Sequence, residues 1–133
     1  GYNGNDEITG NGARDFLTGG AGYDDFNYRL IGDTKTGAGR DRITDFTHGA
    51  DDIDLSVIDA NGTASGNGSF VFLATKGASF TGVRGQLRWS QYDYANNASD
   101  KTIIDGDVNG DAVADFQIEL AGLVSLSAGD FIL

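Results

Sequence analysis

Residues 1–27 read GYNGNDEIT, GNGARDFLT and GGAGYDDFN, three nonapeptides that follow one another without a gap. Each nonapeptide opens with a glycine-rich turn, carries an aspartate at its sixth place and has an apolar residue at its eighth. A further copy, TGAGRDRIT, occupies residues 36–44, and a partial copy, HGADDI, occupies residues 48–53. The stretch from Tyr28 to Thr36 interrupts the series. This repeat therefore organises the first third of the chain.

The nonapeptide resembles the glycine-rich RTX calcium-binding repeats. Glycines let the backbone adopt positive φ and turn carbonyl oxygens into a concave space where a Cβ would clash. The aspartate adds a charged oxygen, and calcium takes about 6 to 8 oxygen ligands. One turn supplies too few, so the ion is expected between two stacked turns. The resemblance implies a parallel β-roll in which two nonapeptides form one coil, with the eighth-place residues Ile8, Leu17 and Phe26 facing inward.

In such a roll, turns on one edge recur about every 18 residues. This spacing predicts two aspartate ladders, one of Asp6, Asp24 and Asp41 and the other of Asp15, Asp33 and Asp51. Several calcium ions are expected, and the predicted ligands in the roll are Gly1, Asn3, Asp6, Gly10, Gly12, Asp15, Gly19, Gly20, Ala21, Gly22, Asp24, Asp33, Gly37, Gly39, Asp41 and Asp51. The alternative is a set of glycine-rich surface turns that happen to carry aspartates.

The composition fits one acidic domain with a modest core. The chain has 133 residues, of which 39% are hydrophobic, and its net charge is -11 from 20 acidic and 9 basic residues. Such a charge repels nucleic acid and anionic membranes and attracts divalent cations. Twelve of the acidic residues lie in residues 1–60, so we expect the first third to be disordered in low calcium and to fold on binding it.

Two classes of structure are excluded by the composition. No run of about 18 apolar residues is present, so no membrane-spanning segment is expected. The chain has no cysteine, so no disulfide can hold it together.

The rest of the chain predicts β-strands and no convincing helix. Residues 59–69 are rich in small polar residues and predict a loop. Strand-like runs follow at residues 70–73, 85–94, 101–104, 116–120 and 130–133, several with the alternation of half-buried antiparallel strands. We therefore expect an all-β fold, with a short parallel β-roll over residues 1–55 and a small antiparallel sheet or sandwich over residues 56–133.

A second resemblance lies in residues 41–46, DRITDF, and residues 51–56, DDIDLS. These stretches are similar to the C-terminal domain of the serralysin-type secreted metalloproteases, a module that also ends other secreted RTX proteins. The family leaves Gram-negative bacteria by type I secretion. The final residues Asp130, Phe131, Ile132 and Leu133 resemble its C-terminal secretion signal, or form a last strand. The resemblance implies an extracellular module joined to an upstream catalytic or adhesive domain.

A second candidate ion site lies in residues 105–115, DGDVNGDAVAD. Asp107, Asn109, Asp111 and Asp115 place oxygens at spacings found in calcium loops. The complete EF-hand pattern fails, because Phe116 stands where the bidentate glutamate belongs. The other interpretation is a polar hairpin between two strands.

No catalytic machinery is visible in the sequence. It has no His-Glu-x-x-His zinc motif and no Gly-x-Ser-x-Gly elbow, so we expect no enzyme activity from this part. His48, the single histidine, is expected in an exposed turn. Trp89 is expected in the core, although with Tyr92 and Tyr94 it offers a possible sugar platform, with the two tyrosines on the opposite strand face.

Two other functions stay open at this point. A polysaccharide-binding accessory module, similar to those of alginate epimerases, would need a basic groove, for which the roll offers Arg14, Arg29, Lys35, Arg40 and Arg42. A calcium-rigidified adhesin spacer is the other, and the few repeats argue against it.

Overall fold

The computed structural model describes residues 1–62 and 66–133, so residues 63–65 of the predicted loop at 59–69 lie outside it. Within these residues the regular elements are short strands and single turns of 3₁₀-helix, which confirms the predicted all-β class. The strands are β1 (Glu7–Ile8), β2 (Phe16–Leu17), β3 (Asp25–Asn27), β4 (Asp41–Ile43), β5 (Asp52–Asp54), β6 (Val71–Phe72), β7 (Gln86–Tyr92), β8 (Lys101–Asp107), β9 (Phe116–Ala121) and β10 (Phe131–Ile132). The 3₁₀ turns are η1 (Ile31–Asp33), η2 (Gly37–Gly39), η3 (Asn97–Ser99) and η4 (Ala128–Asp130). No described helix is long and apolar enough to cross a bilayer.

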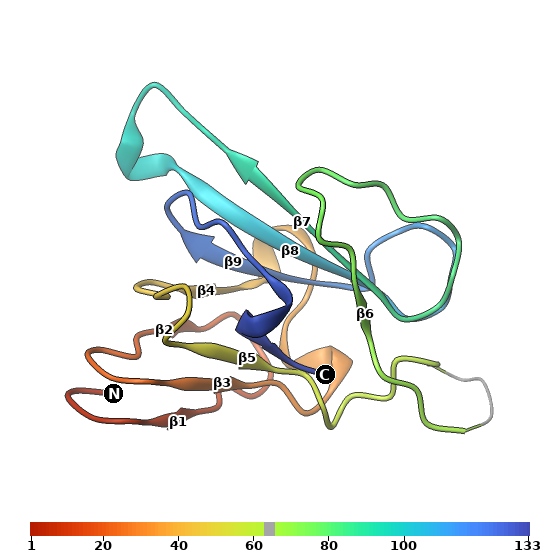
Figure 1. The fold of residues 1–133 in the computed structure, drawn as a ribbon, viewed down its shortest axis with the longest axis horizontal. Helices are drawn as coiled ribbons and strands as arrows, with labels where there is room; N and C mark the ends of the chain where they lie inside the picture. Colours follow the sequence, from red (N-terminus) through yellow and green to blue (C-terminus); the bar gives the residue numbers. More distant parts are fainter. Residues whose placement is uncertain (63–65) are drawn as a thin grey trace.

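The first sheet is wholly parallel and has the order β1-β3-β5-β10 (Figure 1). Its register stacks one apolar column, in which Ile8 pairs with Phe26, Phe26 with Ile53, and Ile53 with Phe131. Phe26 and Ile53 are fully buried. The strand at the end of the chain therefore adds a fourth rung to the roll.

The second sheet is mixed and has the order β2-β4-β9-β8-β7-β6. Strands β2, β4 and β9 are parallel, and they stack Leu17, Ile43 and Leu120 in register. Strands β7, β8 and β9 form the predicted antiparallel part. The antiparallel expectation is wrong for β6, which pairs parallel with β7, and for β10, which pairs parallel with β5. In each case a long connection brings the chain back, so that the strand runs in the same direction as the strand it pairs with.

One core joins the roll to the rest of the chain. Side chains from both sheets and from the segments on either side of residue 55 belong to a single buried cluster. Its fully buried members are Phe26, Tyr28, Ile43, Ile53, Leu55, Leu87, Ile104, Phe116, Ile118 and Leu120. Ile8 and Leu17 pack against it, as expected for eighth-place residues. Whether residues 1–55 and 56–133 also fold separately stays a prediction.

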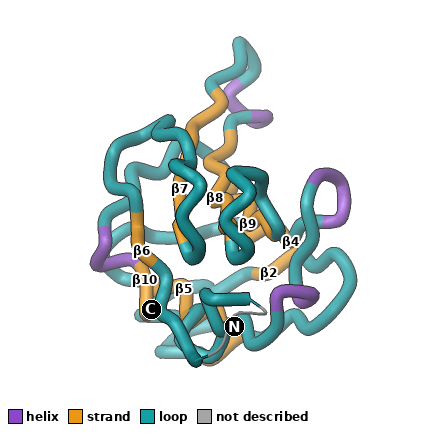
Figure 2. The backbone as a smooth tube through the Cα atoms, turned by 90° about the vertical axis from the view of Figure 1, so that its right-hand side faces the viewer, coloured by secondary structure: helices purple, strands orange, loops and turns teal. Residues whose placement is uncertain are grey.

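The β7–β8 hairpin projects away from the roll (Figures 1 and 2). Trp89 lies at its buried base, 5% exposed, and its indole N–H donates to the carbonyl of Ala74 at 3.1 Å. The core position predicted for Trp89 is therefore confirmed. Tyr92 and Tyr94 are exposed near the tip, each with the Lys101 ammonium over its ring.

Candidate metal centre

The glycine-rich turns stack in pairs along one edge of the roll. The turn over residues 1–6 lies on the turn over residues 19–24, with a parallel bridge between Asn3 and Ala21. The amide of Gly4 donates to the carbonyl of Ala21 at 2.7 Å, and the amide of Ala21 donates to the carbonyl of Tyr2 at 3.0 Å. The predicted recurrence of 18 residues is confirmed here, since Glu7 pairs with Asp25.

Three aspartates of the repeat donate a backbone hydrogen bond to the aspartate of the next coil. On this first edge the amide of Asp6 donates to Asp24 Oδ1 at 2.9 Å, and the amide of Asp24 donates to Asp51 Oδ1 at 3.1 Å. On the second edge the amide of Asp15 donates to Asp41 Oδ1 at 2.9 Å. The backbone of one coil is thus held by the carboxylates of the next.

The predicted membership of the two ladders is wrong. The structure places Asp6, Asp24 and Asp51 on the first edge, and Asp15 and Asp41 on the second, so Asp41 and Asp51 exchange places. The interruption from Tyr28 to Thr36 lengthens the second coil, and partners across it are 26 or 27 residues apart instead of 18. A fixed spacing therefore assigns the later rungs incorrectly.

Asp33 leaves the ladder altogether. Its Oδ2 accepts the amides of Arg29 and Leu30, each at 2.9 Å, so the side chain caps its own loop before η1. The place expected for Asp33, next to Asp15, is taken by Asp41. On the far side of Asp41 lies Thr34, whose Oγ1 accepts the amide of Asp41 at 2.9 Å and donates to the carbonyl of Gln117. The second ladder therefore ends on a neutral hydroxyl.

The second carboxylate oxygen of three ladder aspartates is buried without a partner. These oxygens are Oδ2 of Asp15, Asp24 and Asp41. Asp24 and Asp41 are fully buried, and their Oδ1 atoms already accept backbone amides. A buried charged oxygen without a donor is costly, so the arrangement fits a cation at both edges.

The first glycine of each nonapeptide lies against the aspartate of the same nonapeptide. A Cβ built on Gly10 would come within 2.8 Å of Asp15 Oδ2, and one built on Gly1 or Gly19 would overlap the carboxylate of Asp6 or Asp24. Any larger residue would fill the space between the turn and the carboxylate. The requirement for glycine is therefore local and steric, and it leaves a space lined by oxygens.

The predicted ligands separate into two groups. Those on the first edge are Gly1, Asn3, Asp6, Gly19, Gly20, Ala21, Gly22, Asp24 and Asp51, and those on the second are Gly10, Gly12, Asp15, Gly37, Gly39 and Asp41. Across residues 1–62 and 66–133, no three histidine, aspartate or glutamate side chains converge as a metal-ligating group. Calcium in these turns would therefore take most of its oxygens from backbone carbonyls.

One of these carbonyls is already engaged by a cation. Arg40 donates from Nη1 to the carbonyl of Gly37 at 2.9 Å, and from Nε to Glu119 at 2.8 Å. The amide of Gly37 in turn donates to Gln117. The η2 turn is thus bound to β9 by side chains, unlike the turns of the first edge.

Burial and mutual repulsion perturb the acids of the roll. Burial raises the pKa of Asp41 to about 6, and the carboxylates of Asp15 and Asp33 act in the same direction. Burial also raises the pKa of Asp51 and Asp52, and the Asp25 carboxylate adds to the effect at Asp52. Among the described residues, none of these three carboxylates forms an ion pair.

The segment Asp107–Asp115 forms the connection between β8 and β9. Asp107 is fully buried and accepts the amides of Gly110 and Ala112, and Asp115 accepts the amide of Val108 at 2.8 Å. Asn109 and Asp111 each accept an amide two residues on. This is the polar hairpin of the second interpretation, and ion binding by these four side chains stays a prediction.

The C-terminal residues are ordered against the roll. Asp130 is fully buried and accepts the amides of Gly49 and Ser127, while His48 Nδ1 lies 2.7 Å from its Oδ1. The ring of Phe131 stacks on Phe72 with centroids 4.8 Å apart. His48 is exposed as expected, but its contact with Asp130 was not foreseen. The strand interpretation of the tail is confirmed.

Two further side chains of the turns were missed in the sequence. Asp45 accepts the amides of Gly19 and Gly20 at 2.9 and 2.8 Å and so fixes the start of that turn. It stands directly after the nonapeptide 36–44, at the place where other repeats have glycine, which is the signal that could have found it. Glu119 binds both Arg40 and Arg42, a pairing 79 and 77 residues apart that no local pattern predicts.

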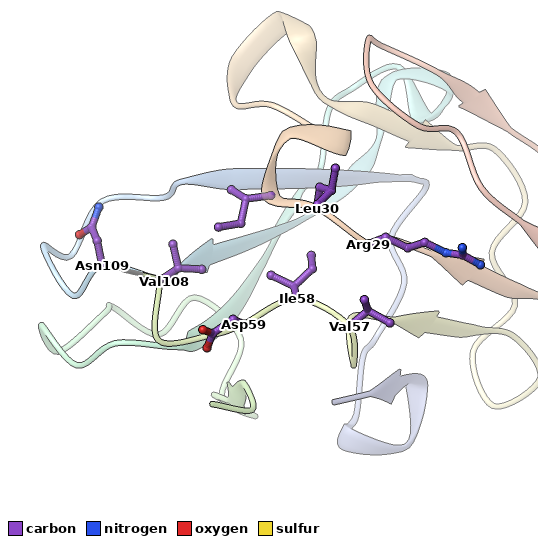
Figure 3. Close-up of a pocket in the computed structure, with 9 residues that line it drawn as sticks. Arg29, Leu30, Val57, Ile58, Asp59, Val108 and Asn109 are labelled. Carbon is purple, nitrogen blue, oxygen red and sulfur yellow. The ribbon is translucent and has the colours of Figure 1, made fainter. Parts of the chain in front are cut away.

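A cavity of about 450 Å³ lies beside the roll (Figure 3). Its lining is mainly apolar, with Leu30, Ile58 and Val108 facing the space and Asp59 at one side. Asp59 Oδ1 already accepts the amides of Asn61 and Gly68, which lowers the pKa of its carboxyl. The cavity contains none of the ladder aspartates and adds no oxygens to the metal centre.

We predict that acidification stabilises the folded chain in chelator. The folded-state pKa of Asp41 lies above its ordinary value, so protons bind preferentially to the folded chain. Lowering the pH from about 7 to about 5 should raise the free energy of unfolding by about 1 kcal/mol for this carboxyl alone. Far-ultraviolet circular dichroism of a chelated sample measures the effect as a gain of β signal on acidification, and Asp41→Asn should lose most of that gain. A β signal that falls over this pH range contradicts the prediction.

Comparison with solved structures finds the same fold in a subunit of an enzyme of Azotobacter vinelandii. The solution structure of the AlgE6R2 subunit of its mannuronan C5-epimerase is 24% identical, with a TM-score of 0.62, over 98% of this chain and 72% of that chain. The AlgE6R3 subunit of the same enzyme is 21% identical, with a TM-score of 0.43, over 99% and 80% of the two chains. No curated protein matches the sequence significantly.

A family model described as Peptidase M10 serralysin C terminal matches residues 1–133. The match spans the repeats, the β7–β9 sheet and the C-terminal strand, and it agrees with the two resemblances found in the sequence. The chain therefore belongs to the serralysin C-terminal family and is an RTX-type module.

Proposed function

We propose that this chain is a non-catalytic, calcium-dependent folding module of a larger secreted protein. The observation that carries the proposal is the set of buried Oδ2 atoms of Asp15, Asp24 and Asp41, which have no hydrogen-bond partner and lie at the glycine-rich turns. Calcium would supply the positive charge that these oxygens lack. Its preference for several oxygen ligands suits turns built from carbonyls and carboxylates.

A second acidic row supports dependence on a cation. The register aligns Glu7 with Asp25, and Asp25 with Asp52, across three neighbouring strands. Like charges on adjacent strands repel one another, and the net charge of -11 adds a general repulsion against compaction. In low calcium the roll would therefore stay unfolded, and binding free energy would become folding free energy outside the cell.

The same coupling would assist export through the type I secretion machinery of a Gram-negative bacterium. An unfolded acidic chain can thread a channel, and folding at the outer side prevents its return. The four final residues act twice in this proposal. They are read by the exporter while unfolded, and later Phe131 pairs with Ile53 in the completed roll.

The alternative of a polysaccharide-binding module is less well supported. It requires unpaired basic side chains along a groove, whereas Arg40 and Arg42 both pair with Glu119, and Arg88 pairs with Asp105. The shared fold with the epimerase subunit carries no substrate to this chain. We therefore do not include a polysaccharide in the proposed function.

Calcium titration of a chelated sample, followed by far-ultraviolet circular dichroism, tests the folding step. We expect a cooperative rise in β signal with calcium and none with magnesium, which demands a stricter octahedral shell. Asp24→Asn keeps the shape of the side chain but removes its charge, and it should need about tenfold more calcium. The matched control is Asp93→Asn, at an exposed site outside the roll, which should titrate as the wild type does. Equal β content in chelator and in calcium would overturn the proposal.

Export of the full-length protein by a type I exporter tests the role of the tail. Ile132 is 39% exposed and pairs with Asp54, so the neutral change Ile132→Thr should preserve calcium-dependent folding while reducing the exported fraction severalfold. His48→Ala weakens the contact with Asp130 without changing the tail sequence, and it should leave export unchanged. Export of Ile132→Thr at the wild-type level would contradict the signal function.

A further inference from the structure

Tyr28 is a buried tyrosine at the point where the repeats are interrupted. It directly follows β3, and its amide donates to the carbonyl of Asp54 at 2.9 Å. Its side chain is 1% exposed. It occupies the first place of the interrupting segment, where the preceding nonapeptides have glycine. A large polar side chain therefore enters the core at a site that the repeat leaves empty.

The buried side chain of Tyr28 lies near enough to the carboxylates of the second edge to interact with them, although no hydrogen bond joins them in the structure. Burial raises the pKa of Tyr28, and the neighbouring carboxylates of Asp41 and Asp15 raise it further. The hydroxyl oxygen of Tyr28 has no hydrogen-bond partner, and neither does Oδ2 of Asp15 or of Asp41. Three of the four unpartnered buried side-chain atoms in the described residues therefore belong to this one group.

Such a group is incomplete as it stands. The group consists of the carboxylates of Asp15 and Asp41 and the phenol of Tyr28. The amide of Asp15 donates a hydrogen bond to only one of the four carboxylate oxygens. Buried carboxylates are normally paired with a cation or with several donors. The phenol O–H can donate to only one oxygen, so a positive charge is still required.

The second edge also has fewer free carbonyls than the first. The carbonyl of Gly37 accepts the guanidinium of Arg40, so it is not available to orient a ligand shell around Asp41. The ladder beyond Asp41 ends on the hydroxyl of Thr34 instead of on another carboxylate. Another group must therefore fix the direction of Asp41 Oδ2.

We propose that Tyr28 is a positioning residue of a calcium site at Asp15 and Asp41, and that its hydroxyl donates from inside the roll to the Asp41 carboxylate. This inference rests on the proposed function, since it assumes that the turns bind calcium. The carboxylates that raise the pKa of Tyr28 are Asp41, Asp15 and Asp33, all from the second edge or its loop. Tyr28 also lines a cavity with Glu7, Asp25 and Asp54 of the first sheet, but not with Asp6 or Asp24. We therefore expect Tyr28 to act on the second-edge site and not on the site at Asp6 and Asp24.

Tyr28→Phe tests the inference, because it removes the hydroxyl and keeps the ring. Calcium binding measured by calorimetry should retain the sites of the first edge and lose about tenfold in affinity at one class of site. At saturating calcium the β signal should equal that of the wild type, since only a hydroxyl is removed and the buried ring is kept. Tyr23→Phe, at an exposed position of the first edge, is the matched control and should bind as the wild type does.

The outcomes separate this inference from the proposed function. If the wild type binds no calcium, the proposed function fails and the inference fails with it. If the wild type binds and Tyr28→Phe binds equally well, only the inference is overturned. A lower unfolding midpoint at saturating calcium with unchanged affinity assigns Tyr28 to packing alone and also overturns it.

A second measurement applies if Tyr28→Phe does not fold. Tyr2→Phe and Tyr23→Phe together remove the tyrosines of the first-edge turns. In this protein, calcium should shift tyrosine absorption to longer wavelength, because the buried phenol of Tyr28 then donates to Asp41. No shift in that protein, despite calcium binding, would contradict the role of Tyr28.

Discussion

The hydrogen bond from the backbone of one aspartate to the carboxylate of the next coil is the constraint on which the rest of the roll depends. It directs Oδ1 of Asp24, Asp41 and Asp51 toward a neighbouring amide. The remaining oxygen of Asp24 and of Asp41 then has no backbone donor within reach and is buried. The same geometry that stacks the coils thus produces the unpaired negative charge. Stacking without a cation is opposed by its own carboxylates.

The roll does not stand apart from the rest of the chain. Its first sheet is extended by β10 and its second by β9, so Phe131 continues one apolar column and Leu120 continues the other. These side chains come from the final 14 residues of the chain (120–133). Order in the turns and order in the tail are consequently linked through shared sheets, so the proposed secretion signal and the candidate metal centre can belong to one folding event.

The local parts of this structure could be predicted from the sequence. The nonapeptide gives the turns, the inward places of Ile8, Leu17 and Phe26, and the first recurrence of 18 residues, because all of these depend on near neighbours. The later ladder rungs could not be predicted. The path of residues 28–36 sets the length of the second coil, and that path depends on contacts such as the one between Thr34 and Gln117, which are 83 residues apart.

The same distinction applies to the candidate site. The carboxylates were identified by their place in the repeat, whereas Tyr28, Thr34 and Asp45 break the repeat and reach the site only through the fold. Tyr28 reads in the sequence as one more aromatic residue before an apolar pair. Only the burial of its hydroxyl near unpaired carboxylates suggests the role proposed for it. Departures from a repeat are thus the places where sequence reasoning is weakest.

The most direct test of the account is hydrogen exchange at the backbone amides of Asp6, Asp15 and Asp24, resolved by nuclear magnetic resonance in calcium and in chelator. These amides donate across the coils, so each one reports whether its own rung is formed. The account predicts slow exchange of all three in calcium and fast exchange in chelator. Equal protection in both conditions would mean that the ladders form without a cation, and it would contradict the central claim.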